Sequence, residues 1–295
     1  MKPLSRTKRR IYLIFFALVF VVSLPLVILY ARGYRLTLSE ALKFGRTGGF
    51  YIAATQSGAE IYIDSKLVKK TGIFQKNVLV QNLKPGSYDI KVVKDGFHTW
   101  TKTLSVFSET VTEAHPFMLP ENPELVEVPP YLSDSGMPTS TPPKASLINT
   151  LRNPEYIQAA ALFSVASSKE TALKSGTSTE ILGIQRKLSV ENRDGRLYIE
   201  WLGKSADIPS YFCQYEQCKS SITLAGLSAV KVFDFYPGRG DLLIIAVSDG
   251  IYVAEMDDRS AQNIQPLFPG KNLDFRIDGD VIFIKQAKRM YFLSL

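Results

Sequence analysis

The chain has 295 residues, of which 45% are hydrophobic and 21% are charged, and 35 Lys and Arg face 28 Asp and Glu. The formal net charge of +7 lies at the start: residues 1–46 hold nine basic side chains and one acid, which leaves 26 basic and 27 acidic side chains in the remainder. Binding to a phosphate backbone requires clustered positive charge, so the composition of the main body excludes nucleic acid as a predicted partner.

The N-terminal segment predicts a membrane-spanning helix. Residues 1–10 form a basic tail, and the following run 11–30 contains no charge, with Ser23 as its one plainly polar residue and Pro25 as its one helix breaker. A helix of this length spans about 30 Å, the thickness of the hydrocarbon core of a bilayer. Because the run exceeds the roughly 7–15 residues of a signal peptide and has no cleavage site, we expect an uncleaved anchor at residues 11–31.

The basic residues on either side of this span predict its orientation. Five precede it directly, whereas four follow it over sixteen positions. The denser cluster favours a single-pass protein of the cell membrane with a cytoplasmic N-terminus and an extracytoplasmic body, and the lipid bilayer as one partner. In such an oxidising compartment, Cys213 and Cys218 are expected to form a structural disulfide across a short loop, with a thiol-redox pair as the alternative.

Residues 48–119 predict a small β domain. Short runs rich in β-branched and aromatic residues are separated by turn signals such as Lys84-Pro85-Gly86 and Asp95-Gly96. Alternation is clearest where Tyr88, Ile90 and Val92 share one face. The expected strands cover residues 49–55, 60–64, 77–81, 86–94, 100–105 and 110–117.

A proline-rich linker is predicted at residues 120–145, because eight of the sixteen prolines fall between positions 116 and 143. The second domain, residues 146–295, is expected to open with a helix that starts at Asn153-Pro154 and ends near residue 168. A buried strand at 158–165 is the alternative. From Ile181 onward the pattern predicts only β structure.

Three hairpins in this second domain share one pattern, in which an apolar strand, a tight turn and a return strand with a central tyrosine follow each other. They cover residues 188–199, 242–253 and 281–292, and the tyrosines are Tyr198, Tyr252 and Tyr291. Units repeated at this spacing favour a β-propeller, although about 150 residues suffice for barely four blades. The predicted fold class is therefore mainly β: a transmembrane helix, a small sandwich, and a complete or incomplete propeller-like domain, with a sandwich as the alternative.

The first module resembles the PEGA domain of bacterial and archaeal surface proteins. The matching motifs are Ser57-Gly58-Ala59 with the strand to Asp64, then Leu83-Lys84-Pro85-Gly86-Ser87-Tyr88, then Lys94-Asp95-Gly96-Phe97 with Trp100. Gln56 and Ser65 depart from the family pattern at turn positions. The resemblance implies a small β-sandwich that serves envelope-associated proteins as a binding or spacer module, and it carries over no catalytic residues.

Few residues are candidates for catalysis, metal binding or ligand binding. The two histidines are His98 and His115, and no zinc, nucleophile-elbow or phosphate-loop motif occurs, so we predict no catalytic residue, no metal site and no cofactor. Tyr88, Phe97 and Trp100, with His98 beside them, are candidates for a ligand platform that stacks on sugar rings, although aromatic residues in such patterns more often belong to the core.

The sequence therefore predicts a membrane-anchored cell-envelope protein that is not an enzyme, with an ectodomain for binding or scaffolding. Cell-wall glycan and envelope proteins are the candidate partners. The alternative is an envelope carbohydrate-active enzyme with carboxylates on loops of the C-terminal domain, because such chemistry leaves little trace in one sequence. A further alternative is an accessory subunit of a membrane complex.

Overall fold

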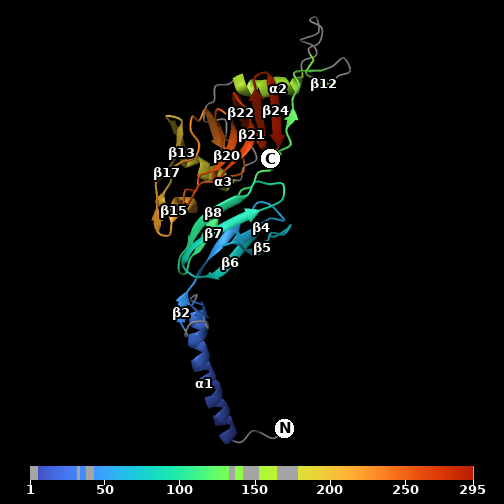
Figure 1. Ribbon diagram of the computed structural model, residues 1–295. Coiled ribbons are helices and arrows are strands. Elements are labelled where there is room, and N and C mark those ends of the chain that lie inside the picture. Colours follow the sequence, from blue (N-terminus) through green and yellow to red (C-terminus); the bar gives the residue numbers. More distant parts are fainter. Residues whose placement is uncertain are drawn as a thin grey trace. The chain divides into compact units, whose positions relative to one another are not determined.

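The computed structural model describes residues 6–31, 34–37, 43–132, 137–141, 153–164 and 179–294. The fold is mainly β with one long N-terminal helix, which confirms the predicted class (Figure 1). The chain divides into two compact units, Met1–Ile90 with Thr103–Pro116 and Lys91–Lys102 with Phe117–Leu295.

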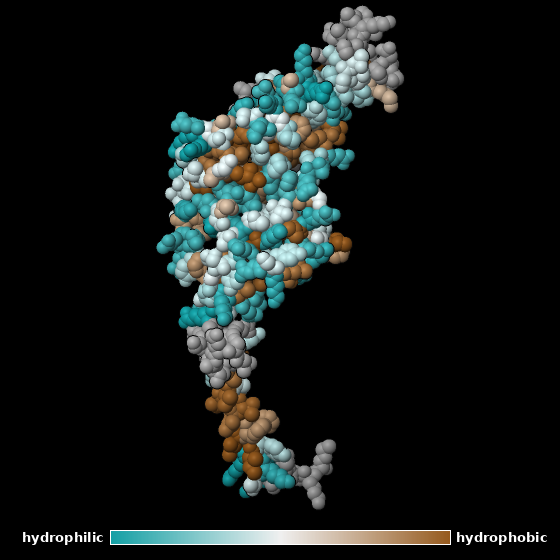
Figure 2. All heavy atoms as spheres, viewed as in Figure 1, coloured by the Kyte–Doolittle hydropathy of each residue, from teal (hydrophilic) through white to brown (hydrophobic). Residues whose placement is uncertain are grey.

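The first unit begins with helix α1, Arg6–Ala31, which contains Pro25. From Arg6 to Tyr30 the helix is long and apolar enough to cross a membrane, and none of its apolar window is buried in the protein. Figure 2 shows this apolar segment in brown beyond the basic end of the helix. The hydroxyl of Ser23 donates a hydrogen bond to the carbonyl of Phe20, so the one polar side chain of the span has a partner within the helix. A helix that is apolar on all sides is typical of a membrane span or of a protein core, and in this chain its apolar window is not buried in the protein.

Two antiparallel strands, β1 (Tyr34–Thr37) and β2 (Lys43–Arg46), pair after the helix. The following module has two sheets, with orders β6-β3-β9 and β5-β4-β7-β8. Its strands are β3 (Gly48–Ala53), β4 (Glu60–Ile63), β5 (Lys66–Lys70), β6 (Asn77–Leu83), β7 (Gly86–Val93), β8 (Trp100–Val106) and β9 (Val111–Ala114). In the first sheet β3 is antiparallel to β6 and parallel to β9. All six predicted strands are present, which leaves β5 as the strand that the sequence pattern did not predict.

In the first unit, side chains that alternate along the strands form the buried face. Phe50 and Ile52 on β3 are fully buried, and Ile61 on β4 and Val78 on β6 are buried with them. The turn between β4 and β5 places Asp64 and Ser65 in the left-handed region, at φ 48° and 65°. A two-residue turn of this kind joins strands with the natural twist of a hairpin, so Ser65 fills a position that usually favours glycine.

The second unit contains two short helices and several antiparallel sheets. Helix α2 is Pro154–Ser164 and helix α3 is Thr179–Arg186. The amide of Glu155 donates to the side-chain oxygen of Asn153, so the predicted N-cap and the choice of helix over strand are confirmed. The expected extension of α2 to residue 168 lies outside the described residues.

The prediction of only β structure from Ile181 is wrong for the stretch that forms α3. Ile181 and Ile184 are spaced at the helical period, Ile184 packs against the core, and the buried Gln185 donates from its side chain to the carbonyl of Arg239. Strands begin at Leu188, directly after the helix.

Three sheets of successive antiparallel strands follow. The first has the order β13-β14-β17, with β13 Leu188–Arg193, β14 Arg196–Trp201 and β17 Ser221–Thr223. The second is β18-β19-β20-β21, with β18 Val232–Phe235, β19 Leu242–Ala246, β20 Gly250–Glu255 and β21 Ile264–Pro269. The third is β22-β23-β24-β10, with β22 Leu273–Asp278, β23 Val281–Gln286, β24 Arg289–Ser294 and β10 Val126–Glu127.

The strand pairings confirm all three predicted hairpins. No closed propeller is detected among the described residues, and the propeller-like arrangement stays a prediction. Within the predicted linker, β10 pairs with β24, Val128 is buried against Ala159 and Met290, and β11 (Tyr131–Leu132) pairs with β12 (Pro138–Thr139). Residues 133–136 and 142–145 of that linker lie outside the described part of the chain.

Candidate binding surface

Two groups of polar side chains in the second unit are candidates for a functional site, and one of them is buried. Along β8, Trp100 and Lys102 both occupy the buried face, and Lys102 is only 4% exposed. The Nζ atom of Lys102 donates to Glu255 Oε1 at 2.6 Å and to the carbonyl oxygen of Asp257 at 2.7 Å. Burying an ammonium group is costly unless it is paired, and these oxygens supply the pairing.

Both carboxylate oxygens of Glu255 already accept hydrogen bonds from protein groups. Its Oε2 accepts the indole N–H of Trp100 at 2.9 Å, and its Oε1 also accepts the backbone and side-chain N–H groups of Asn263. The neighbouring carboxylate of Asp257 accepts from both Nε and Nη2 of Arg259. We refer to Trp100, Lys102, Glu255, Asp257 and Arg259 as the buried charge cluster. General acid or base work needs a group that can reach a substrate, so this cluster is suited to structure.

The second arrangement is open to solvent. On β13, β14 and β17 the side chains alternate, with Val190, Leu197, Ile199 and Ile222 buried in the core and polar residues on the other face. The strand register puts Glu191 opposite Tyr198, and Glu200 opposite Ser189 and Ser221. We call this solvated face of β13, β14 and β17 the outer sheet face. A concavity of about 330 Å³ lies on it, lined by Ser189, Glu191, Arg193, Tyr198, Ile199, Glu200, Ser220 and Ser221.

Charge and aromatic groups meet in this concavity. The guanidinium of Arg193 lies 5.2 Å from the centre of the Tyr198 ring and donates to Glu191 at 2.7 Å. The guanidinium therefore contacts both the face of the Tyr198 ring and the carboxylate of Glu191. Carboxylates, hydroxyls and a guanidinium around one aromatic ring suit a polar ligand that both accepts and donates hydrogen bonds. The sequence pattern singled out Tyr198 only as a hairpin tyrosine, although the alternation of polar residues along these strands marked the face as solvated.

A scan against protein families matches residues 47–118 to the PEGA domain. These residues form a PEGA domain. A search of curated proteins found no match. Among solved structures, a candidate membrane-associated protein of unknown function from Bacteroides fragilis is similar over 84% of this chain and 94% of that chain, at 11% identity. Its TM-score of 0.20 is too low to support an argument about this chain.

The predicted ligand platform in the PEGA domain requires correction at Trp100. This side chain is 1% exposed and belongs to the buried charge cluster, so it is not accessible to a sugar ring. The hydroxyl of Tyr88 donates to the carbonyl of Lys84, and its ring packs edge-on against Phe50. His98 is half-buried, and its backbone N–H donates to the carbonyl of Leu119. These three residues therefore have packing and backbone partners, as core and strand-edge residues do.

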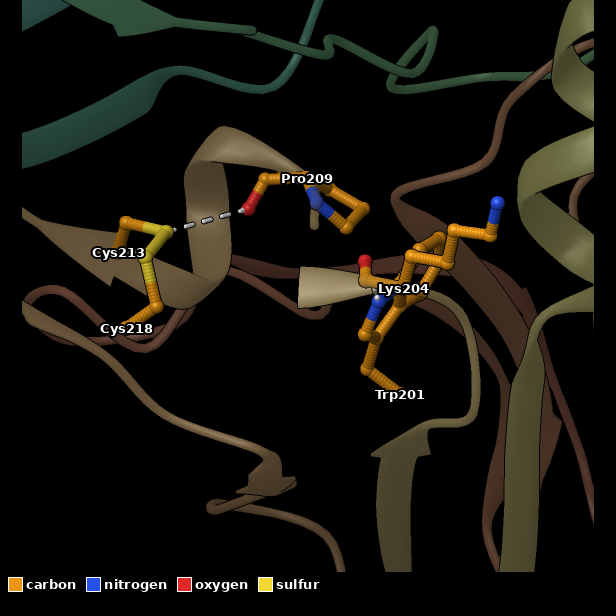
Figure 3. The surroundings of a disulfide bond; sticks show 5 residues. All are labelled: Trp201, Lys204, Pro209, Cys213 and Cys218. Atoms are coloured by element: carbon orange, nitrogen blue, oxygen red, sulfur yellow. Dashed lines mark hydrogen bonds between the residues drawn. A yellow bond between two sulfur atoms is a disulfide. The ribbon is translucent and has the colours of Figure 1, made fainter. Parts of the chain in front are cut away.

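C-terminal to the PEGA domain, the structure joins Cys213 to Cys218 in a disulfide between the two-residue strands β15 (Cys213–Gln214) and β16 (Gln217–Cys218). Figure 3 shows the sulfur of Cys213 beside the carbonyl oxygen of Pro209, at 3.9 Å. A disulfide sulfur carries no hydrogen, so this is a contact without donation. Nearby, the indole of Trp201 donates to the carbonyl of Lys204. The disulfide closes a short loop, so its effect on stability is local.

No group of three or more metal-ligating side chains occurs within the described residues. One half-buried carboxyl has a shifted pKa: desolvation raises the pKa of Asp234 from 3.8 to about 6, against the opposing effects of the Phe235 N–H and the Arg276 charge. Its Oδ1 accepts that N–H at 2.8 Å. A raised pKa is a signal of function only when the group lines a site. Asp234 does not line the concavity on the outer sheet face, so we interpret it as a cost of packing β18.

Asp234→Asn should therefore change the pH dependence of stability. The pKa of the Asp234 carboxyl is higher in the folded protein than in the unfolded chain. The contribution of this carboxyl to the free energy of unfolding is therefore most favourable below pH 3.8, and it is lost as the pH rises through about 6. The amide keeps the acceptor for Phe235, so we expect the variant to be more stable than the parent at pH 7 by about 1–3 kcal/mol, with little difference at pH 4. Urea unfolding at both values, followed by tryptophan emission, measures this. Asp280→Asn, at an exposed turn, is the control; an unchanged pH slope in Asp234→Asn would refute the interpretation.

Proposed function

We propose that this protein is anchored in the cell membrane by α1, with a cytoplasmic N-terminus, and that its extracytoplasmic body binds a cell-envelope partner without catalysis. The anchor is supported by a helix that is apolar on every side and unburied. The denser basic cluster before the span supports the orientation. The disulfide between Cys213 and Cys218 is compatible with an oxidising compartment.

The observation that carries the binding proposal is the concavity on the outer sheet face. Its carboxylates, serine hydroxyls and the Arg193–Tyr198 pair form a polar surface with one aromatic ring. Sugars present hydroxyl groups and apolar ring faces together, so an envelope glycan is the ligand class that this surface suits best. In the buried charge cluster, by contrast, every carboxylate is already engaged, which supports a binding role over a catalytic one.

Binding is tested with the full chain in lipid nanodiscs and a panel of soluble peptidoglycan fragments and envelope polysaccharides. We expect one glycan class to be retained, and Tyr198→Ala to weaken its binding at least about tenfold, which is the size of one stacking contact with its hydrogen bonds. Tyr215→Ala, which removes a 53% exposed tyrosine outside the concavity, is the matched control.

The same incubation separates the two functions. Release of a cleaved glycan that disappears in Glu191→Gln or Glu200→Gln would establish the carbohydrate-active enzyme in place of the binding protein. Equal retention by the parent and by Tyr198→Ala would remove the outer sheet face as the binding site.

Topology is tested on the cysteines. In intact cells, a membrane-impermeant thiol reagent should label Cys213 and Cys218 only after reduction, because both are in the disulfide. Labelling that occurs only in inverted membrane vesicles would overturn the orientation.

A further inference from the structure

The PEGA domain has a second surface with unusual composition, at β5 and the loop after it. All five residues of β5 are exposed, and β5 is the edge strand of the sheet β5-β4-β7-β8 (Figure 1). In the following loop Ile73 is 78% exposed and Phe74 is 101% exposed. We call residues 66–76 the apolar tip. Exposed large apolar side chains that gather in this way mark contact sites.

The apolar tip is held firmly at its base. Thr71 is 4% exposed, its hydroxyl donates to the carbonyl of Gln56 at 2.8 Å, and it accepts the N–H of Ala59 at 2.8 Å. The N–H of Gly72 donates to the carbonyl of Gln75, which closes the loop across Ile73 and Phe74. The two apolar side chains are therefore presented outward by a closed turn on a buried support.

The charge within the apolar tip itself is of one sign. Residues 66–76 contain Lys66, Lys69, Lys70 and Lys76 and no acidic residue. Lys70 pairs with Glu60 at 3.2 Å. Lysines on an edge strand oppose pairing with another strand, so the tip is poorly suited to strand addition. Apolar side chains at an apex flanked by lysines instead match the boundary between lipid headgroups and acyl chains when the headgroups are anionic.

We propose that the apolar tip docks on an anionic lipid surface, where Ile73 and Phe74 enter the interface and the lysines contact the headgroups. The inference rests on the proposed anchoring by α1, because only sixteen residues separate Ala31 from Gly48 and this tether keeps the domain close to a bilayer. The docking gives the chain a second membrane contact, which would limit the rotation of the PEGA domain about its tether.

The test uses the full chain reconstituted in vesicles of phosphatidylcholine alone or mixed with phosphatidylglycerol. The two native cysteines are joined in the disulfide, so Phe74→Cys provides one thiol for a polarity-sensitive fluorophore. Val111→Cys, a 52% exposed position of the same domain, is the matched control. In the mixed vesicles we expect the label at position 74 to shift its emission to shorter wavelength and to lose several-fold in quenching by acrylamide, with no change at position 111.

Replacing Lys66, Lys69 and Lys76 together with glutamine should return the label at position 74 to its aqueous emission. An aqueous signal from position 74 in both kinds of vesicle would overturn the proposal, as would a shift that depends on protein concentration instead of lipid charge, because that result indicates contact between copies. Retention after alkaline extraction reports separately on α1. Loss of the chain at that step refutes the anchor, whereas retention with an aqueous label refutes only the docking.

Discussion

Lys102→Ala should lower the free energy of unfolding of the second unit by about 3–5 kcal/mol, the usual cost of leaving one partner of a buried ion pair without the other. The substitution removes the charge that lies 2.6 Å from Glu255 Oε1 and 3.8 Å from the carboxylate of Asp257. Glu255 would keep its N–H donors but lose the ammonium group that contacts its Oε1, at a position that is only 3% exposed. The ion pair between Lys102 and Glu255 lies within the folded chain, so this loss of stability does not depend on any ligand.

Tryptophan emission during urea unfolding measures this effect, because both tryptophans, Trp100 and Trp201, belong to the second unit. The matched control is Lys219→Ala, which breaks an ion pair of similar length, 2.9 Å to Asp258, with a lysine side chain that is 59% exposed. Surface pairs contribute about 0–1 kcal/mol. Equal losses in the two variants would show that burial of Lys102 does not set the strength of the interaction.

Gly48→Ala should destabilise the PEGA domain by about 3 kcal/mol, at the upper end of the range for overpacking. A Cβ at this position would overlap the carbonyl oxygen of Phe107 and lie 2.8 Å from the carbonyl oxygen of Thr110. Both obstacles are backbone atoms of the turn that precedes β9, so neither can turn aside as a side chain does. Relief requires that β3 and this turn separate, where the amide of Gly49 now donates to the carbonyl of Thr110.

Hydrogen exchange read by mass spectrometry measures the change at β3, β6 and β9, where protection should fall. The control is Gly183→Ala in helix α3, where a Cβ meets nothing within 4 Å. That substitution should stabilise its helix by up to about 1 kcal/mol, because alanine loses less backbone entropy than glycine. Unchanged protection in Gly48→Ala would contradict the prediction, because it would mean that the backbone of the turn before β9 moves to admit the Cβ at little cost in free energy.

The strands of the PEGA domain were predictable where one face is buried. In β8 the buried positions alternate from Trp100 to Val106, and this alternation is visible in the sequence. In β5 no face is buried, so the signal on which such predictions depend does not exist there. Helix α3 was missed for a related reason, because its eight residues span few helical turns and Gly183 weakens the pattern.

The two polar arrangements differ in how far the sequence anticipates them. The outer sheet face follows from alternation along β13 and β14, since Ser189, Tyr198 and Glu200 occupy the positions between buried residues. The buried charge cluster does not follow from any local pattern, because Lys102 and Glu255 are 153 residues apart in the sequence. A lysine in the apolar register of β8 was the one available sign. Trp100 was open to both a surface and a core interpretation until its partner was known.

The pairing of β10 with β24 has a consequence for synthesis of the chain. Val126 and Glu127 lie opposite Phe292 and Tyr291, near the very end of the sequence. During translation β10 emerges early, whereas its partner β24 follows only after strands β13 to β23 have been made. Until then the third sheet lacks its last strand, and the early strand has an unpaired edge. Loss of β24 alone would therefore leave β10 without its partner and keep that edge open.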